Sequence, residues 1–324
     1  MRKYKSFIFF LFPILAFSQS LKGITREVDV SFSNHSALLS AQERFPEVNL
    51  GISAKGKLVK SSYNILYSKL NGISLELDFF EPKTRSTNQL PGIILIHGGG
   101  WRSGDRSQHH QMAIELAAQG FVVFTPQYRL STHALFPAAI LDVKYFIQWV
   151  KENASSFGLN PNKVALIGYS AGGQMAAFIG ATIDHPSYQN IEQKSSENTS
   201  VQAVVDIDGI LAFLHPDSGE GDDSKRTSAA TYYFGYSKEE NPELWQEAGA
   251  LNHVSADAPP FLFINSSVER MHAGRKDFRK ILNDHNIHSE VYTFPEAPHV
   301  FPLIDKWFEA TCILIVDFLT QELK

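Results

Sequence analysis

Cysteine is almost absent from this chain, since Cys312 is the single one among 324 residues. One thiol excludes an internal disulfide, a cysteine-rich zinc site and a redox pair of cysteines. Because Cys312 lies in the apolar run 312–316, we expect its thiol to be buried and inert. The chain also lacks charge runs, low-complexity tracts and repeats of solenoid length, which argues against disordered and repeat proteins.

The N-terminal apolar run is too short for a membrane anchor. It covers 7–17, about 11 residues, whereas a membrane-spanning helix needs roughly 20. Basic residues at Arg2, Lys3 and Lys5 precede the run, and Ala16-Phe17-Ser18 closes it with small residues suited to cleavage. This order is typical of a secretory signal peptide over 1–18, so we expect a secreted or periplasmic protein.

Positive charge is scarce as well. Lys and Arg number 29 against 34 Asp and Glu, which gives a formal charge of −5, and removal of 1–18 would leave about −8. Such a surface repels nucleic acid and anionic membranes, so we expect neither as a partner. The acidic stretch 217–223 does not have the ligand spacing of a calcium loop, and we expect no metal.

The remaining chain alternates between short apolar strands and helices. Because such alternation produces crossover units, the sequence predicts an α/β fold with a mainly parallel, doubly wound sheet and helices on both faces. Active sites of these sheets lie at the carboxyl ends of the strands. The expected strands cover 63–70, 73–80, 92–96, 121–124, 164–167, 201–207, 261–264 and 290–294, and the expected helices cover 112–118, 137–151, 174–183, 274–284 and 304–319.

The domain plan has two parts after the leader. We assign 19–60 to an N-terminal extension and 61–324 to one catalytic domain. Within that domain, Asn71-Gly72 predicts a tight hairpin turn between the first two strands. An insertion at about 211–254, largely polar with scattered aromatic residues, separates two strands and is expected to shape access to the site.

The strongest motif is Gly-Tyr-Ser-Ala-Gly at 168–172, which fits G-x-S-x-G. In this motif the serine lies on a sharp turn between a strand and a helix, and the glycines keep the crowded backbone free of side-chain clashes. An expected strand precedes the motif and an expected helix of small residues follows it. The context therefore favours Ser170 as a nucleophile.

A second motif, His-Gly-Gly-Gly-Trp at 97–101, directly follows the apolar strand at 92–96. The unhindered backbone N–H groups of Gly99 and Gly100, together with that of Ala171, predict an oxyanion hole. His97 is expected to fix this loop through ring hydrogen bonds rather than to act as a base.

Taken together, residues from about 63 to 322 resemble the α/β-hydrolase esterases of the hormone-sensitive-lipase and carbohydrate-esterase type. The matching pieces occur in family order and spacing: 97–101, Tyr-Arg-Leu at 128–130, Phe-Pro-Ala at 136–138 with Asp142, 168–173, and Pro-His at 298–299. The resemblance implies an α/β-hydrolase fold and a serine–acid–histidine set without a cofactor. Arg129 and Asp142 are expected to form a structural polar pair.

His299 is the expected base, because it lies in a proline-flanked loop after the last strand, where this fold places its histidine. The resembled family carries its acid a few residues after the strand at 261–264, and Glu269 occupies that place. Asp208, after the preceding strand, is the alternative, because some members of the fold supply their acid from there. Asp277 is a third and weaker candidate.

The narrower resemblance is to exported acetyl-esterases and pectin or xylan esterases. It implies a serine ester hydrolase that removes acetyl or methyl groups from plant polysaccharide. Trp101, Arg102 and Arg270 are expected to bind substrate, and the basic side chains near the site favour a uronate-bearing polymer such as pectin. A serine peptidase and a general short-chain carboxylesterase are alternatives. A non-catalytic binding module is another, although Ser170 and His299 are both retained here.

Overall fold

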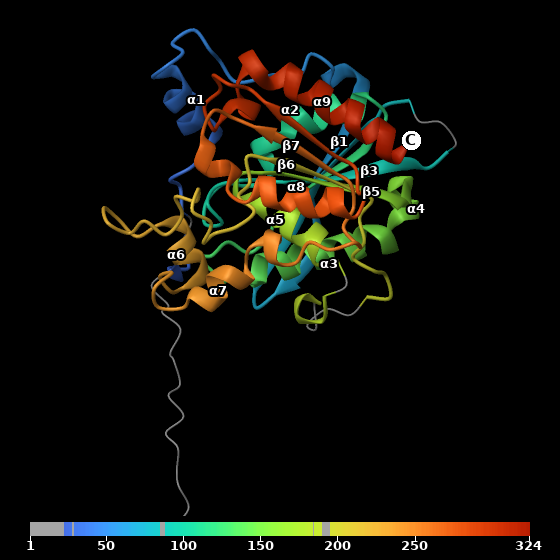
Figure 1. The fold of residues 1–324 in the computed structure, drawn as a ribbon. Helices are drawn as coiled ribbons and strands as arrows, with labels where there is room; N and C mark the ends of the chain where they lie inside the picture. The colour runs from blue at the N-terminus through green and yellow to red at the C-terminus, as the bar shows by residue number, and fades with distance from the viewer. Residues whose placement is uncertain (1–22, 28, 85–87, 184, 190–194) are drawn as a thin grey trace, which may run out of the picture.

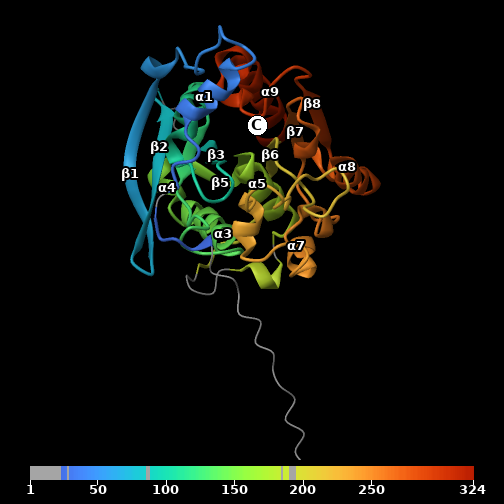
Figure 2. The ribbon, with the colours of Figure 1, turned by 90° about the vertical axis from the view of Figure 1, so that its left-hand side faces the viewer.

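The computed structural model describes residues 23–27, 29–84, 88–183, 185–189 and 195–324, so the expected signal peptide at 1–18 lies outside the described residues. Within these ranges eight strands form one sheet in the order β1-β2-β4-β3-β5-β6-β7-β8 (Figures 1 and 2). The strands are β1 (Val59–Leu70), β2 (Ile73–Pro82), β3 (Leu90–Ile96), β4 (Val122–Pro126), β5 (Leu159–Tyr169), β6 (Ala203–Ile207), β7 (Phe261–Asn265) and β8 (Ser289–Thr293).

The sheet is antiparallel at one edge and parallel in the middle. β2 pairs antiparallel with both β1 and β4, and the strands from β4 through β3 to β8 pair in parallel. Asn71 and Gly72 both have positive φ, 49° and 83°, which confirms the tight turn predicted between β1 and β2. The predicted parallel, doubly wound sheet is confirmed.

Helices cover both faces of the sheet (Figure 1). The core on one face draws its side chains from α1, α2 and α9, and the core on the other face draws them from α3, α5 and α8. All five helices expected from the sequence form, with shifts of a few residues at their ends. The helices are α1 (Asn34–Gln42), α2 (His110–Ala118), α3 (Ala138–Glu152), α4 (Ala154–Phe157), α5 (Ala171–Ala181), α6 (Ala229–Phe234), α7 (Pro242–Glu247), α8 (Arg275–Asp284) and α9 (Asp305–Leu323).

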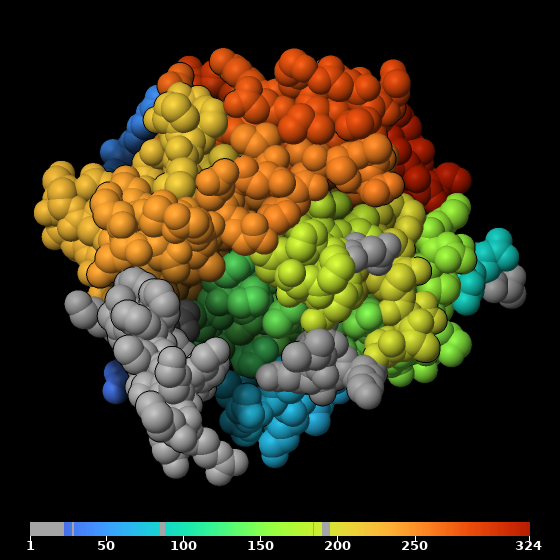
Figure 3. All heavy atoms as spheres, turned by 60° about the horizontal axis from the view of Figure 1, so that its bottom comes forward, coloured from blue at the N-terminus to red at the C-terminus, as the bar shows by residue number. Residues whose placement is uncertain are grey.

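The insertion at 211–254 carries α6 and α7 and stands at one end of the molecule (gold and orange in Figure 3). Its expected polar character holds only for its outer part. Phe213, Tyr233, Phe234 and Trp245 are fully buried and pack their rings against one another. The aromatic residues, which looked scattered in the sequence, therefore form a compact root for the insertion.

The segment before β1 packs back onto the catalytic side of the sheet. The backbone N–H of Arg26 donates to the carbonyl of Thr132 at 2.8 Å, and Asp29 forms a parallel bridge with Ser103. Farther along, Ala37 and Ala41 of α1 enter the core beside α2 and α9. As expected, Cys312 is buried, within α9. None of the helices in the described part of the chain is long and apolar enough to cross a membrane.

Candidate active site

Ser170 lies at the sharp turn between β5 and α5, as the motif predicts. Its φ of 55° and ψ of −120° fall outside the regions that L-residues ordinarily adopt, which is the strained turn expected of this motif. The turn has no space for larger neighbours, because a Cβ on Gly168 would lie 1.9 Å from the carbonyl oxygen of Gly172. The two glycines of the motif are therefore required by close backbone approach.

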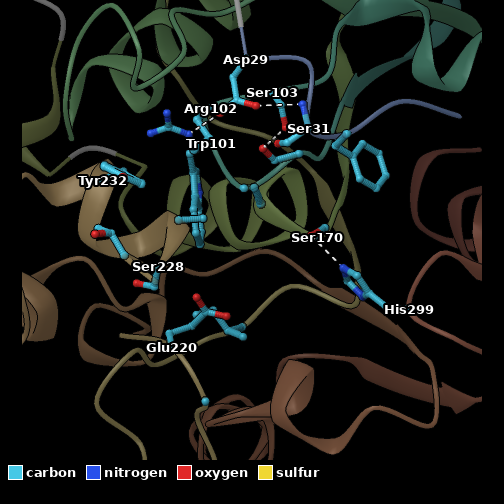
Figure 4. Close-up of a pocket in the computed structure, with 18 of the residues that line it drawn as sticks. Asp29, Ser31, Trp101, Arg102, Ser103, Ser170, Glu220, Ser228, Tyr232 and His299 are labelled. Atoms are coloured by element: carbon cyan, nitrogen blue, oxygen red, sulfur yellow. Dashed lines mark hydrogen bonds and ion pairs between the residues drawn. The ribbon is translucent and has the colours of Figure 1, made fainter. Parts of the chain in front are cut away.

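Two hydrogen bonds connect Ser170, His299 and Asp208 in a line. The Nε2 atom of His299 lies 2.9 Å from the Ser170 hydroxyl oxygen, and its Nδ1 atom lies 2.9 Å from Oδ2 of Asp208 (Figure 4 shows the first pair). The second contact fixes the ring so that Nε2 faces the serine. This arrangement is the geometry of a serine nucleophile with its general base and orienting acid.

Asp208 follows β6 directly and is fully buried. Its Oδ1 atom accepts a hydrogen bond of 2.8 Å from the backbone N–H of Ser266, and Nε2 of His272 lies 3.5 Å from the same oxygen. Burial alone would raise the pKa of Asp208, but the imidazoles of His272 and His299 and the side chain of Ser266 outweigh it and hold the pKa below its usual range. The carboxylate is therefore ionised at neutral pH.

The preference for Glu269 as the acid was wrong. Glu269 is exposed and begins a 3₁₀ turn at Glu269–His272, whereas the Asp208 carboxylate occupies the place beside His299. The place near the end of β7 holds Ser266, which contributes a backbone N–H to Asp208 instead of a carboxylate to His299. Asp277 is also excluded, because it faces His215 from the first turn of α8 and is largely exposed.

The glycine-rich loop after β3 lies beside the Ser170 turn. A Cβ on Gly98 would come within 3.1 Å of the Ser170 Cβ, and Gly99 has φ of 121°, a conformation that favours glycine. Across the described residues, none accepts a hydrogen bond from the backbone N–H of Gly99, Gly100 or Ala171. These three groups border the cleft and are available to a developing oxyanion.

His97 supports this loop, as predicted. Its Nδ1 atom lies 2.8 Å from the carbonyl oxygen of Gly98, and its ring stacks on that of Tyr128 at 4.4 Å. Burial lowers the pKa of His97 to about 4, so the ring is neutral at neutral pH. The predicted pair of Arg129 and Asp142 is also confirmed, with a buried ion pair of 2.7 Å.

A cleft of about 710 Å³ opens above Ser170 and His299. Its walls come from segments far apart in the sequence: residues 29–32 before the sheet, the loop at 99–103, the insertion at 219–232, and the turn after β7. The extension before β1 thus contributes directly to the site. This contribution could not be predicted from the sequence, because Asp29, Ser31 and Phe32 belong to no motif.

The substrate-binding residues expected from the sequence all border the cleft, but they are already engaged. The Arg102 Nε atom lies 2.5 Å from Asp29, and its guanidinium stacks on the Tyr232 ring at 4.1 Å. Arg270 pairs with Glu220 at 2.9 Å. Trp101 is only 4% exposed and stacks on Tyr233 beneath the loop. Figure 4 shows Asp29 with Arg102 at one side of the cleft and Glu220 at the opposite side.

The charges that line the cleft are balanced. Three carboxylates and three guanidinium groups border it: Asp29, Glu220 and Asp222 against Arg102, Arg226 and Arg270. The positive charge expected to attract a uronate is therefore offset by acidic residues that are distant in the sequence and lie close only in the folded chain. Among the described residues no group of three or more His, Cys, Asp or Glu side chains is placed to hold a metal ion.

Comparison with known proteins gives a consistent result. A family model described as BD-FAE matches residues 77–271. The esterase LipC of Mycobacterium tuberculosis (strain ATCC 25618 / H37Rv) is 32% identical over 71% of this chain and 57% of its own length. The probable carboxylic ester hydrolase LipM of the same strain is 28% identical over 74% of this chain and 56% of its own length. The chain therefore spans little more than half the length of these curated relatives.

Solved structures agree on the fold. A truncated carbohydrate esterase from gut microbiota superimposes with a TM-score of 0.69 at 22% identity, over 84% of this chain and 99% of that chain. The propionate-bound esterase Est2 of Thermogutta terrifontis gives a TM-score of 0.65 at 20% identity, over 86% of this chain and 97% of that chain. Both likenesses support an α/β-hydrolase arrangement of the sheet and helices.

Proposed function

Because the chain belongs to the BD-FAE family of α/β-hydrolases, we propose that it is a serine ester hydrolase that removes short acyl groups from glycans. The observation that carries the proposal is the line of two hydrogen bonds, each 2.9 Å, from Ser170 through His299 to Asp208. Three free backbone N–H groups beside the serine complete the set that ester hydrolysis needs.

The reaction proceeds in two acyl-transfer steps. His299 Nε2 takes the proton of Ser170 as its oxygen attacks the ester carbonyl carbon, and the carbonyl oxygen becomes an oxyanion held by the N–H groups of Gly99, Gly100 and Ala171. The imidazolium then gives that proton to the departing alcohol oxygen. Water, deprotonated by His299, hydrolyses the acyl-serine in the second step. Asp208 stays ionised throughout and stabilises the imidazolium.

The aromatic root of the insertion supports a preference for short acyl groups. Trp101 of the glycine-rich motif packs against Phe213 and Tyr233 of this root, and all three side chains are nearly or fully buried, so their rings occupy space that a long acyl chain would need. Each methylene that enters an apolar pocket would add roughly 0.8 kcal/mol of binding, so a long pocket would make kcat/KM rise with acyl length. We expect p-nitrophenyl acetate to be cleaved with higher kcat/KM than the octanoate. A steady rise toward octanoate would contradict this expectation.

The balanced charge of the cleft bears on the polymer. Pectin and xylan are both compatible with acetyl or methyl ester chemistry, but de-esterified pectin is a polyanion and needs local positive charge. Two of the basic residues expected to supply it, Arg102 and Arg270, each have a carboxylate partner within 2.9 Å. We therefore propose a neutral glycan such as acetylated xylan as the substrate. Action outside the cytoplasm, after removal of 1–18, remains part of this proposal.

The central test is Ser170→Ala assayed on p-nitrophenyl acetate. Loss of the nucleophile should lower kcat by about 10⁶-fold, as in other serine hydrolases, while circular dichroism and the melting temperature stay close to wild type. A serine-directed organophosphate should label the wild-type protein at Ser170 and leave the variant unlabelled. Unimpaired turnover by the variant would reject the mechanism.

A further inference from the structure

A second hollow of about 230 Å³ lies next to the catalytic cleft. Thr227 and Tyr232 border both spaces, so they form the wall between them. The Tyr232 ring is held in place by the Arg102 guanidinium, which stacks on it from the cleft side. A substrate that extends past Tyr232 would therefore enter this hollow.

The hollow is built rigidly. Its floor is the end of α6 and the turn that follows, where the carbonyl of Tyr236 accepts a 3.1 Å hydrogen bond from the buried Trp245 side chain. Ser237 and Glu240 hold each other: the Ser237 N–H donates to the Glu240 carboxylate at 2.8 Å, and the Glu240 N–H donates to the Ser237 hydroxyl at 3.2 Å. These hydrogen bonds connect the residues that line the hollow and support its shape.

The lining defines the chemistry of an occupant. It consists of two glycines, hydroxyl groups of serine, threonine and tyrosine, and the carboxylates of Asp223 and Glu240. Among the described residues that line it, none is a lysine or an arginine. Carboxylates accept hydrogen bonds and repel anions, so the hollow suits a neutral donor of several hydroxyl hydrogen bonds and disfavours a uronate.

We propose that this hollow is a remote subsite that binds a neighbouring sugar of a neutral glycan whose esterified unit lies in the cleft. The inference rests on the proposed function and extends it from a small ester to a chain. Its occupant is an uncharged pyranose. The Tyr232 ring, which separates the two spaces, is placed to contact the linkage between the two sugars.

The test compares monoacetylated xylose, xylobiose and xylotriose, with p-nitrophenyl acetate as the reference substrate. For the wild-type protein, we expect kcat/KM relative to the reference to rise about tenfold from the first to the third, as one well-placed set of hydrogen bonds would give. Ser237→Trp fills the hollow and should remove that rise. Glu239→Trp places the same ring on the exposed neighbour, outside the lining, and should retain it.

Three outcomes would overturn the subsite: no dependence on chain length, a dependence that survives Ser237→Trp, or an equal gain for acetylated oligogalacturonides. A second measurement separates this inference from the proposed function. Calorimetry can measure the affinity of wild type and of Ser237→Trp for unmodified xylotriose and xylose. This measurement requires no catalysis. If p-nitrophenyl acetate is not hydrolysed, the proposed function fails, whereas tighter binding of xylotriose to wild type alone still supports the subsite.

Discussion

The floor and the rim of the catalytic cleft are held by different kinds of contact. The floor consists of Ser170, Asp208 and His299, which stand on turns directly after strands or in a loop that follows one, and its acid is fully buried. The rim consists of two arginine–carboxylate pairs on segments outside the sheet, and Arg270 in one of them is 50% exposed. Buried charges are costly to leave unpaired, whereas exposed pairs contribute little. The Arg102 and Asp29 side chains are only 15% and 17% exposed, so it is changes to the half-exposed Arg270 that should be far less damaging than changes to the floor.

The largest expected contrast lies between two carboxylates. Asp208→Asn should lower kcat on p-nitrophenyl acetate by about 10⁴-fold, because the amide no longer holds the imidazole in its working tautomer. Glu269→Gln alters an exposed side chain that does not border the cleft, and this variant should remain near wild type. Steady-state kinetics of the two variants in one buffer gives the comparison. A severe loss of kcat in Glu269→Gln together with a normal kcat in Asp208→Asn would show that Glu269, and not Asp208, is the acid.

An intermediate effect concerns the buried histidines that support the floor. Burial lowers the pKa of His97 to about 4 and of His109 to about 3, from an ordinary value of 6.5. Between pH 6.5 and pH 4 the unfolded chain therefore binds more protons than the folded one, and the free energy of unfolding falls as the pH falls. Each histidine should contribute a loss on the order of 3 kcal/mol over that interval.

His109→Phe sharpens this point, because it removes one titrating ring but keeps an aromatic contact with Tyr169. Urea unfolding at neutral pH and at about pH 4.5 should show a smaller loss of stability in this variant than in the wild type. His35→Gln, an exposed histidine on α1, is the matched control and should keep the full pH dependence. An unchanged pH dependence in His109→Phe would show that His109 is not held neutral in the folded state.

The smallest expected effects are in the rim. Arg270→Ala should change the free energy of unfolding by no more than about 1 kcal/mol, since the Arg270 side chain is half exposed in its pair with Glu220. Turnover of p-nitrophenyl acetate should be near wild type, and KM for an acetylated glycan should rise by no more than about fivefold. Added salt should matter little, because the charges of the cleft are balanced. A strong salt dependence on the polymer would favour an anionic substrate after all.

The same division explains which parts of the molecule the sequence predicts. The strand and helix pattern, the nucleophile and the histidine all follow from local signals: apolar runs, the glycines around Ser170, and a histidine after the last strand. The acid does not, because Asp208 and Glu269 both follow a strand, and the choice depends on which carboxylate the folded sheet brings to His299. The distance between each carboxylate and His299 depends on the tertiary fold and cannot be predicted from a local sequence pattern.

The rim is the least predictable part for a similar reason. Arg102 and Arg270 can be recognised in the sequence as basic residues near the site, but their partners Asp29 and Glu220 lie 73 and 50 positions away. The aromatic residues of the insertion also have no regular spacing, so their joint burial depends on the tertiary fold. Because of this long-range pairing, the site that the sequence predicted to be basic and open has balanced charges and is partly filled by aromatic rings in the structure.

The position of the acid has a consequence for how the cleft of this protein can vary in sequence. Because Asp208 projects from the end of β6, the loop after β7 carries no side chain of the Ser–His–Asp line, and it supports Asp208 through the backbone N–H of Ser266 and the imidazole of His272. The rest of that loop, which includes Arg270 and Met271, is part of the wall of the cleft. This part of the loop can therefore change in length and charge, which would alter the wall of the cleft while Ser170, His299 and Asp208 keep their positions.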